Sequence, residues 1–432
     1  MKRILILTFI VLTALSSCTD KAVNQLKSDI LGDPLMDKVV GMSLDLASTG
    51  FNAGSSYAET WIRDFNTFIE LSMEVMPHDV VKETLNVFWG FQGPEGDIID
   101  GFVPSENAGV DYVYRFSGHY PSFQAHKNTV ETDQEASMVQ AVYKFVTRSG
   151  DVGYLAEDAF GMKVIERLEF ALDYLRSCKW NDKYGLITGA TTADWGDVQP
   201  EHSWGVEIDE NTHYAIDIYD NAMFVLAIKD YLELCRSCGV DGNAAKWETI
   251  LDTLTQNVRK YLWDSEKQKF IPHIYLNGSP FPDDFDENEL YYHGGTAIAI
   301  EAGLLTRDEI AASNARMLEN VEKSGAPTIG LTIYPPYPEG FFQNKGMYPY
   351  GYQNGGDWTW FGGRMIQVLV ANGFVREAYD EIQPMLRRVV DNDSFHEWYQ
   401  VDGKAVGSGT FRGEAGVLFK AIEMLREWAE SE

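Results

Sequence analysis

Apolar residues recur every three to four positions along most of the chain, which is the spacing of amphipathic α-helices. Several of these periodic stretches are separated only by a short turn, as at Ser149-Gly150-Asp151 and at residues 371–374, so neighbouring helices are expected to form hairpins. The predicted helices cover residues 37–46, 61–76, 80–91, 131–147, 162–178, 212–238, 244–262, 294–302, 307–321, 358–371, 375–390 and 412–427.

Strand patterns are few and short, as at residues 184–187 and 270–274. No G-x-G-x-x-G follows a predicted strand, and no P-loop is present. About twelve helices in pairs predict an all-α fold, an (α/α)6 barrel of about six helical hairpins. A stacked helical solenoid is the alternative architecture, but no repeat of fixed period supports it.

Long polar and aromatic segments interrupt the helices, at residues 92–130, 180–211, 264–292, 323–356 and 391–411. In a barrel of hairpins, we expect such loops to gather on one face and to build an active-site cleft there. They contain much of the Trp, Tyr, Asp and Gly of the chain. That mixture is typical of sugar sites, where aromatic faces stack on the ring and carboxylates bind the hydroxyls.

The overall composition limits the choice of partner. The chain has 432 residues, 45% of them hydrophobic, which is ample for a large core. Its 65 acidic and 35 basic residues give a formal net charge of −30. This charge argues against nucleic acid and against acidic polysaccharides as partners, so a neutral substrate fits better. The alternative interpretation is that the charge only supports solubility.

The first residues have the pattern of a secretory signal. Met1-Lys2-Arg3 precede an apolar run that ends at Leu15, which is too short for an ordinary membrane-spanning helix. Leu15-Ser16-Ser17-Cys18 resembles the bacterial lipobox, which implies cleavage before Cys18 and lipidation of that residue. The alternative is a plain signal peptide with an incidental cysteine.

The chain is therefore expected to have three parts: a lipoprotein signal peptide over residues 1–17, a tether over 18–30 and one domain over 31–432. The expected location is the bacterial cell envelope, with the protein held by its lipid on the periplasmic or surface side of the outer membrane. Three further cysteines, Cys178, Cys235 and Cys238, lack the βαβ context of a redox site and nearby zinc ligands. No metal or organic cofactor is expected.

The first candidate motif lies at the start of a predicted helix and contains Trp61, Arg63 and Asp64. An Arg-Asp pair beside a tryptophan can bind sugar hydroxyls, with Arg63 holding the Asp64 carboxylate in place. The alternative is a salt bridge that caps the helix.

A second motif, with Glu131, Asp133 and Glu135, also begins a predicted helix. The helix dipole explains why most of these acidic residues stand there, and one of them is a candidate for the cleft.

A third motif places Asp194 and Asp197 on either side of Trp195-Gly196 in an irregular loop. A tryptophan beside a carboxyl group can exclude water and raise the pKa, as a general acid requires. The alternative interpretation is an Asx-turn without catalytic function.

Two further motifs lie towards the C-terminus. Asp357 and Trp358 follow an amide-rich loop and lead into a helix, so Asp357 is either a sugar ligand or the N-cap. Glu397 lies among aromatic residues, including Trp398, in a segment expected to be a loop. A buried glutamate is costly unless it has a partner or a function, which favours catalysis.

In this order, the motifs resemble those of the six-hairpin glycosidases: alkaline/neutral invertases, trehalases and processing α-glucosidases. Residues 61–65 are similar to the Ile-Arg-Asp-Phe stretch of the invertases, and 354–358 resemble their Asn-Gly-Gly-Ser-Trp segment. Residues 192–195 lie where relatives have a Ser-Gly-x-Asp-type acid loop, and 397–399 resemble the Glu-Tyr-Tyr segment that holds the base. The resemblance spans about residues 55–428.

The resemblance implies an inverting, exo-acting hydrolase of neutral, α-glucoside-like oligosaccharides or disaccharides. Asp194 would be the general acid and Glu397 the general base, about 6.5–9.5 Å apart so that a water fits between them. Ala193 replaces the usual glycine before the acid, so Asp197 stays open as the alternative. Asp357 stands where the invertases have serine. The expected substrate-binding residues are Trp61, Arg63, Asp64, Trp195, Asp197, Asp357, Trp358 and Trp398.

Two other functions stay open. An unsaturated-uronide hydrolase or lyase on the same barrel would bind anionic sugars and need basic residues in its cleft, whereas Arg63 is nearly alone in these motifs. A non-catalytic glycan-binding lipoprotein would keep the aromatic platforms but would need no paired carboxylates.

Overall fold

The computed structural model describes residues 21–109, 113–204 and 206–431. The expected signal peptide and the lipidation residue Cys18 lie outside these residues. Residues 21–31, which include most of the expected tether over 18–30, are helical, and Leu26 and Ile30 are buried in the core. Within the described residues, no helix combines the length and the apolar composition that crossing a bilayer requires.

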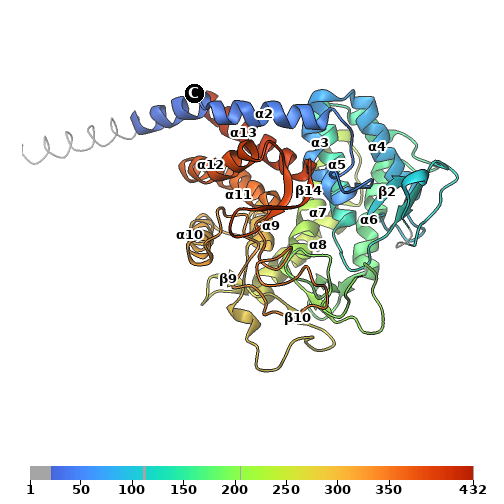
Figure 1. Cartoon of the computed structure of the whole chain (residues 1–432). Coiled ribbons are helices and arrows are strands. Elements are labelled where there is room, and N and C mark those ends of the chain that lie inside the picture. The colour runs from blue at the N-terminus through green and yellow to red at the C-terminus, as the bar shows by residue number, and fades with distance from the viewer. Residues whose placement is uncertain (1–20, 110–112, 205, 432) are drawn as a thin grey trace, which may run out of the picture.

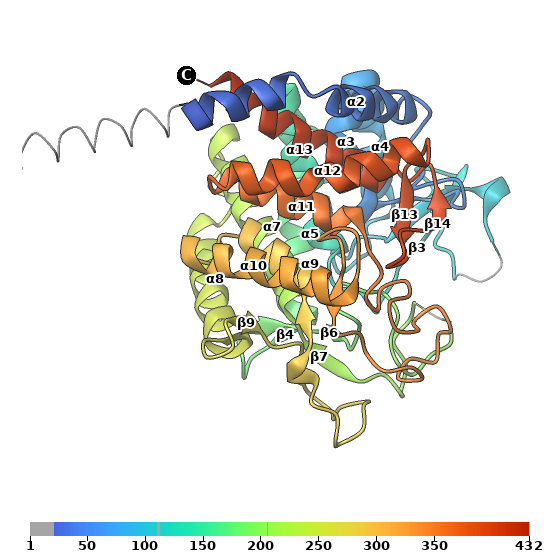
Figure 2. The ribbon, with the colours of Figure 1, turned by 60° about the vertical axis from the view of Figure 1, so that its left-hand side comes forward.

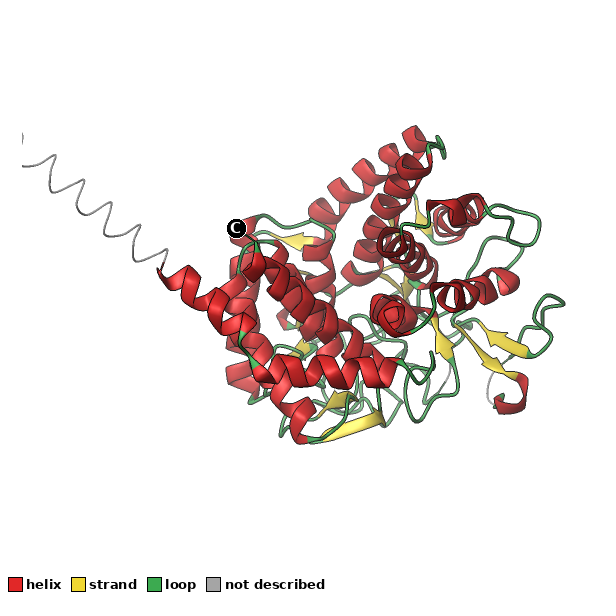
Figure 3. Cartoon of the chain, turned by 90° about the horizontal axis from the view of Figure 1, so that it is seen from above, coloured by secondary structure: helices red, strands yellow, loops and turns green. Residues whose placement is uncertain are grey.

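Helices make up most of the described chain, as the view from above shows (Figure 3). The mostly helical fold is therefore confirmed. The helices that follow residues 21–31 are α2 (Pro34–Ala47), α3 (Ile62–Val75), α4 (His78–Phe91), α5 (Gln134–Ser149), α6 (Val164–Cys178), α7 (Ile218–Cys238), α8 (Ala244–Asn257), α9 (His293–Glu301), α10 (Arg307–Ser324), α11 (Thr359–Ala371), α12 (Val375–Asp391) and α13 (Arg412–Glu430).

Alternate helices form a closed inner ring. Helices α3, α5, α7, α9, α11 and α13 contact one another in that order, and α13 contacts α3. The remaining helices lie outside this ring, where α2, α4, α6, α8, α10 and α12 each contact the inner helix that follows or precedes them in the chain (Figure 1). Figure 2 shows α9 to α13 side by side.

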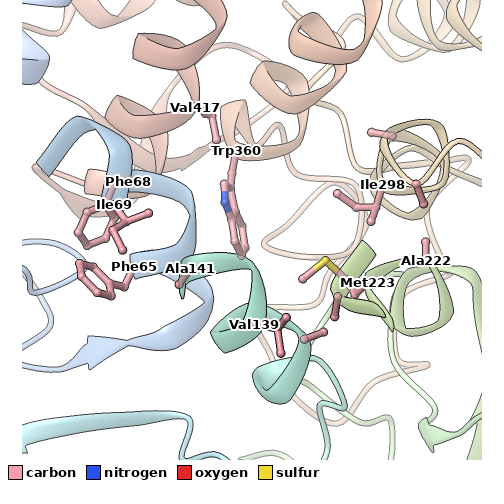
Figure 4. Packing of buried hydrophobic residues seen from close by; sticks show 14 of the residues in the cluster. Phe65, Phe68, Ile69, Val139, Ala141, Ala222, Met223, Ile298, Trp360 and Val417 are labelled. Atoms are coloured by element: carbon pink, nitrogen blue, oxygen red, sulfur yellow. The ribbon is translucent and has the colours of Figure 1, made fainter. Parts of the chain in front are cut away.

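The distribution of apolar residues explains which helices lie inside. Helices α9 and α11 are apolar on nearly every side, so burial on all faces suits them. Helix α12 has one apolar stripe and a charged opposite face, as expected for an outer helix. Side chains from all six inner helices meet in the core, among them Phe65, Val139, Met223, Ile298 and Trp360 (Figure 4).

The connections differ at the two ends of the ring. Most inner helices pass to the next outer helix by a short link, as between α3 and α4 or between α11 and α12. The glycine at the end of α7, Gly239, has a φ of 69° and begins the short link to α8 in the left-handed conformation. An outer helix returns to the next inner helix by a long segment, so these segments precede the N-terminal ends of the inner helices.

The long segments carry short antiparallel strands. One sheet has the order β1 (Thr60–Trp61), β2 (Gly101–Pro104), β3 (Phe123–His126), and another has the order β10 (Ile274–Tyr275), β7 (Tyr214–Ile216), β6 (Gly189–Ala190). The two-stranded pairs are β4 (Trp180–Asn181) with β5 (Leu186–Ile187), β8 (Trp263–Asp264) with β9 (Lys269–Phe270), β11 (Tyr291–Tyr292) with β12 (Ile333–Tyr334), and β13 (His396–Tyr399) with β14 (Ala405–Gly409).

Two predicted helices are shorter than expected. The segment from Thr212 to Asp217 is not helical, because Tyr214–Ile216 forms β7 and pairs with β6 and β10. Helix α8 ends at Asn257 and continues as a π-helical turn over Val258–Leu262. Both changes shorten an element without altering the order of the helices.

Candidate active site

A cavity lies at the N-terminal ends of the inner helices. The first turns of α3 and α11 and the residue before α13 contribute to it, together with the long segments. The lining residues are Ala53, Tyr57, Trp61, Arg63, Asp64, Asp100, Glu131, Trp195, Asp197, Tyr352, Gln353, Trp358, Trp360, Glu397 and Phe411.

The first motif is held in place by backbone pairing. Trp61 lies opposite Gly101 in the β1–β2 ladder, and the Ile62 amide donates to the carbonyl oxygen of Asp100 at 2.8 Å. Helix α3 starts immediately afterwards, so Arg63 and Asp64 occupy its first turn. The sheet therefore positions three expected binding residues together with Asp100, which the sequence analysis did not single out.

Arg63 is buried and paired with carboxylates other than Asp64. Its Nε lies 2.7 Å from Oδ2 of Asp133, and its Nη2 lies 2.8 Å from Oε1 of Glu131. The Tyr219 hydroxyl also donates to Asp133 at 2.7 Å. The expectation that Arg63 holds the Asp64 carboxylate is therefore wrong. Of the second motif, Glu131 lines the cavity, whereas Asp133 pairs with Arg63 without lining the cavity.

Asp64 is buried beside the cavity, and burial raises the pKa of its carboxyl to about 7. No described residue hydrogen-bonds its Oδ1. The buried indole N–H groups of Trp61, Trp195 and Trp360 likewise have no partner among the described residues. Oδ2 of Asp100 also lacks a hydrogen-bond partner within the described chain, so five lining side chains hold unsatisfied polar atoms. Leaving such atoms unsatisfied is costly unless a polar ligand pairs with them.

Three tryptophans form one wall. The ring of Trp195 lies edge-to-face with Trp358, at 4.7 Å between centroids, and with Trp360, at 5.4 Å. The Arg63 guanidinium lies 5.8 Å from the centre of the Trp195 ring, within cation–π range. This wall gives the cavity the apolar faces that sugar rings require beside the carboxylates.

Asp194 does not line the cavity, so the expectation that it faces Glu397 there is wrong. Both of its carboxyl oxygens accept from the Gly295 amide, at 2.9 and 3.1 Å, in the first turn of α9. Burial raises the pKa of Asp194 to about 8, although the amides at that helix end favour the ionised form. A Cβ on Gly294 would lie 2.8 Å from Oδ2 of Asp194, so the glycine permits this close approach. Asp194 thus anchors its loop to α9.

Asp197, three residues later, lines the cavity. Gln353 holds it from the other side: the Gln353 amide donates to Oδ1 of Asp197 at 2.6 Å, and the Asp197 backbone N–H donates to Oε1 of Gln353 at 3.2 Å. Asp194 has a φ of 55°, a left-handed conformation that turns the chain between the two aspartates. The carboxylate of this loop that faces the cavity is therefore that of Asp197.

Glu397 lies in strand β13 and not in a loop as expected. Its Oε1 accepts from the Tyr57 hydroxyl at 2.8 Å, and its Oε2 accepts from the Ser408 amide of β14 at 2.8 Å. Burial raises the pKa of Glu397, while both hydrogen bonds lower it. Trp398 does not line the cavity and lies edge-to-face with Tyr352, at 6.3 Å between ring centroids, so its expected place in the cavity is wrong. The β13–β14 register shifts between His396 and Trp398, around Glu397.

Asp357 is also absent from the cavity lining, which corrects its expected role in sugar binding. It is fully buried, accepts from the Thr328 hydroxyl at 2.8 Å and pairs with Nη2 of Arg388 at 2.8 Å. It is not the N-cap either, because Trp358 takes that position in α11. Asp357 joins the segment before α11 to α12.

Several lining residues were not predicted as site residues, namely Tyr57, Asp100, Tyr352, Gln353, Trp360 and Phe411. Tyr57, Tyr352, Gln353 and Trp360 lie within five residues of predicted site residues, so proximity in the chain could have signalled them. Asp100 and Phe411 become neighbours of these residues only through tertiary contacts.

The described residues contain no cluster of His, Cys, Asp and Glu that could hold a metal ion. Cys178, Cys235 and Cys238 are free and do not line the cavity. The functional groups that line the cavity are carboxyl groups, one arginine, aromatic rings and the amide of Gln353.

No family model and no curated protein matches the sequence. Among solved structures, the GH63 mannosylglycerate hydrolase from Thermus thermophilus, in complex with Tris and D-glycerate, is similar with a TM-score of 0.63 at 16% identity. That match covers 89% of this chain and 99% of the other.

Rhamnosidases are similar too. The GH78 rhamnosidase of Bacillus sp. GL1 has a TM-score of 0.60 at 14% identity over 90% of this chain and 34% of the other. The rhamnosidase from Klebsiella oxytoca with rhamnose bound has a TM-score of 0.60 at 14% identity over 92% and 64%. At these identities the likeness establishes a shared fold, so the expected resemblance to six-hairpin glycosidases is confirmed at the level of the fold.

Proposed function

We propose that the chain is a glycoside hydrolase on an (α/α)6 barrel, in which Asp197 is the general acid and Glu397 the general base. One observation carries the proposal: both carboxyl groups line the same tryptophan-walled cavity at the N-terminal ends of the inner helices. The shared fold with GH63 and GH78 hydrolases supports it. A purely glycan-binding protein would not need two such carboxyl groups.

The position of Asp197 favours its role as the acid. An outer hollow adjoins the cavity and shares four lining residues with it, Tyr57, Trp61, Asp197 and Tyr352. Asp197 therefore borders both spaces, whereas Glu397 lines only the inner one. With the sugar in the cavity and the leaving group in the outer hollow, Asp197 lies next to the glycosidic oxygen that must be protonated.

Glu397 then acts on the opposite face of the sugar. Its two hydrogen-bond donors favour the ionised form that a base requires. In an inverting mechanism, Glu397 takes a proton from water as that water attacks the anomeric carbon, while Asp197 gives its proton to the departing oxygen. The bond to the leaving group breaks as the bond to water forms, and the anomeric configuration inverts.

The charges of the cavity favour a neutral sugar, and the resemblance to the six-hairpin glycosidases adds that it is α-glucoside-like and bound at its non-reducing end. Five lining residues are acidic, and the single lining cation, Arg63, is already paired with Glu131 and Asp133. A uronate would find no unpaired cation among the lining residues, which disfavours an unsaturated-uronide hydrolase or lyase. The unsatisfied polar atoms of Asp64 and the indoles offer partners for sugar hydroxyls.

The test is a panel of aryl glycosides and disaccharides, followed by NMR of the first anomer released. Asp197→Asn and Glu397→Gln should each lower kcat by about 10²–10⁴-fold. An activated dinitrophenyl leaving group needs little protonation, so it should restore much of the rate to Asp197→Asn and not to Glu397→Gln. Asp402→Asn, at an exposed turn, is the control. If no glycoside of the panel is hydrolysed, the proposal is wrong and glycan binding alone is favoured.

We also propose export and lipid anchoring at Cys18, from the lipobox-like residues before it. Replacing Cys18 with serine should release the protein from the membrane fraction, because acyl chains are the anchor in this arrangement. If Cys18→Ser stays membrane-bound, anchoring through this residue is wrong.

A further inference from the structure

We infer that the outer hollow binds an uncharged leaving group that stacks on Trp204, and that it discriminates against a leaving group bearing a carboxylate. This inference rests on the proposed function, since it assigns the space next to Asp197 to the aglycone. It names the chemical class of that part of the substrate.

The lining of the hollow suits a ring. Beyond the four residues that it shares with the cavity, its lining residues are Val198, His202, Trp204, Val206 and Asn344. Trp204 is 62% exposed, so its side chain offers the kind of surface on which a sugar or aryl ring stacks. Asn344 adds an amide that can bind hydroxyl groups.

The electrostatics of the hollow oppose an anion. Of the described residues, those lining it include no lysine and no arginine, and Asp197 contributes a carboxyl group. His202 is its one residue that can become cationic, and Nε2 of His202 lies 3.3 Å from Oδ2 of Asp209. Any positive charge on this histidine is therefore compensated by its own partner.

A neighbouring space has the same electrostatic character. It shares His202 with the outer hollow and is also lined by Glu201, Glu210 and His213. His213 hydrogen-bonds Glu201 through Nδ1, so this second histidine is paired as well. A carboxylate bound across the two spaces would meet two glutamates and Asp197 but no unpaired cation among the described lining residues, and like charges in a partly buried site repel.

The test compares two glycosides of one sugar, the glycone that the panel identifies, on glyceramide and on glycerate. The two aglycones have the same size and linkage and differ by one charge. The glyceramide glycoside should have a kcat/KM about tenfold higher. Asn344→Lys, which places a cation in the hollow, should move that ratio towards one.

A second comparison tests the stacking platform. Trp204→Ala should lower kcat/KM for a phenyl glycoside about tenfold, mainly through KM, and should affect the glycosyl fluoride much less because fluoride does not reach the hollow. Phe116→Ala, at a 76% exposed aromatic residue outside both spaces, is the matched control and should change neither rate.

The outcomes separate the two proposals. If the fluoride is hydrolysed but the two glyceryl glycosides react equally well, or Trp204→Ala affects fluoride and phenyl glycoside alike, the aglycone assignment is overturned and the proposed function stands. If neither the fluoride nor any glycoside reacts, the proposed function fails and this inference fails with it.

Discussion

The Tyr57 hydroxyl donates a hydrogen bond of 2.8 Å to Oε1 of Glu397, across 340 residues of sequence. It joins the segment before α3 to strand β13, so the two ends of the domain meet at the proposed base. The Ser408 amide holds the other carboxyl oxygen. The orientation and the pKa of Glu397 therefore depend on two donors that the experimenter can remove separately.

Replacing Tyr57 by phenylalanine should shift the pH profile. A hydrogen bond to the ionised form lowers a carboxyl pKa, so its loss should raise the pKa of Glu397 further above the ordinary value. Because the base works only when ionised, the acidic limb of kcat/KM should move to higher pH, with a loss of at most about tenfold at the optimum.

The control is Tyr348→Phe, at a half-exposed tyrosine that accepts a hydrogen bond from Gln400 and lies outside the cavity. Its acidic limb should coincide with that of the unmodified enzyme. An unchanged limb in Tyr57→Phe would show that this hydroxyl does not tune the base.

Asp194 and Asp197 should separate stability from catalysis. Asp194→Ala removes the acceptor at the start of α9 and leaves alanine in a left-handed conformation, so the free energy of unfolding should fall by about 2 kcal/mol or more. At temperatures where this variant is folded, KM should change little. Urea denaturation and initial rates measure both quantities.

Asp197→Asn should behave in the opposite way, with a large loss of kcat and little loss of stability, because its carboxyl borders open space. Should Asp194→Ala abolish turnover while folded and Asp197→Asn keep it, the acid would have to be reassigned to Asp194.

The choice between these two aspartates illustrates what the sequence can predict. Helix periodicity is local, and the bounds of α9, α11 and α12 were predicted to within one or two residues. The direction of a carboxylate in an irregular loop is not local. It depends on the left-handed backbone at Asp194 and on the N-terminus of α9, 101 residues away in sequence.

The same reasoning explains the other differences. Trp398 neighbours the proposed base in sequence but stays outside the cavity, because the segment is a strand with a register shift at Glu397 where a loop was expected. Asp100 enters the cavity only because β2 pairs with β1 beside Trp61. Motif order thus identified the right segments, while strand pairing and helix ends decided which side chain of each segment faces the cavity.

Asp357 should matter for stability. Asp357→Ala removes the nearest carboxylate partner of the buried Arg388, which then keeps Glu414 at 4.0 Å as its one described ion-pair partner, so the free energy of unfolding should fall by about 3 kcal/mol. Arg236→Ala, which breaks an exposed pair with Glu233, is the matched control and should cost less than about 1 kcal/mol. Equal effects of the two changes in urea titrations would contradict a structural role for Asp357.

Asp64 should make stability depend on pH. Its folded-state pKa of about 7 exceeds the usual value of an unfolded aspartate, because burial disfavours the charged form. Between about pH 4 and 7 the unfolded chain therefore holds fewer protons at this group than the folded protein, and the contribution of Asp64 to stability falls as the pH rises. Asp64→Asn removes that contribution. The free energy of unfolding of Asp64→Asn minus that of the unmodified protein should therefore be about 2 kcal/mol larger at pH 8 than at pH 5.

Thermal or urea unfolding at the two pH values measures this difference, and Asp402→Asn, whose carboxyl is exposed, should show none.

Asp64→Asn also reports on binding, because the unsatisfied Oδ1 of Asp64 lies beside the cavity. An amide keeps one acceptor and adds two donors, so KM should rise by about tenfold at most while kcat changes less. A stability difference that is the same at pH 5 and pH 8 would mean that Asp64 is ionised in the folded protein, and its role as a neutral partner for a sugar hydroxyl would then be wrong.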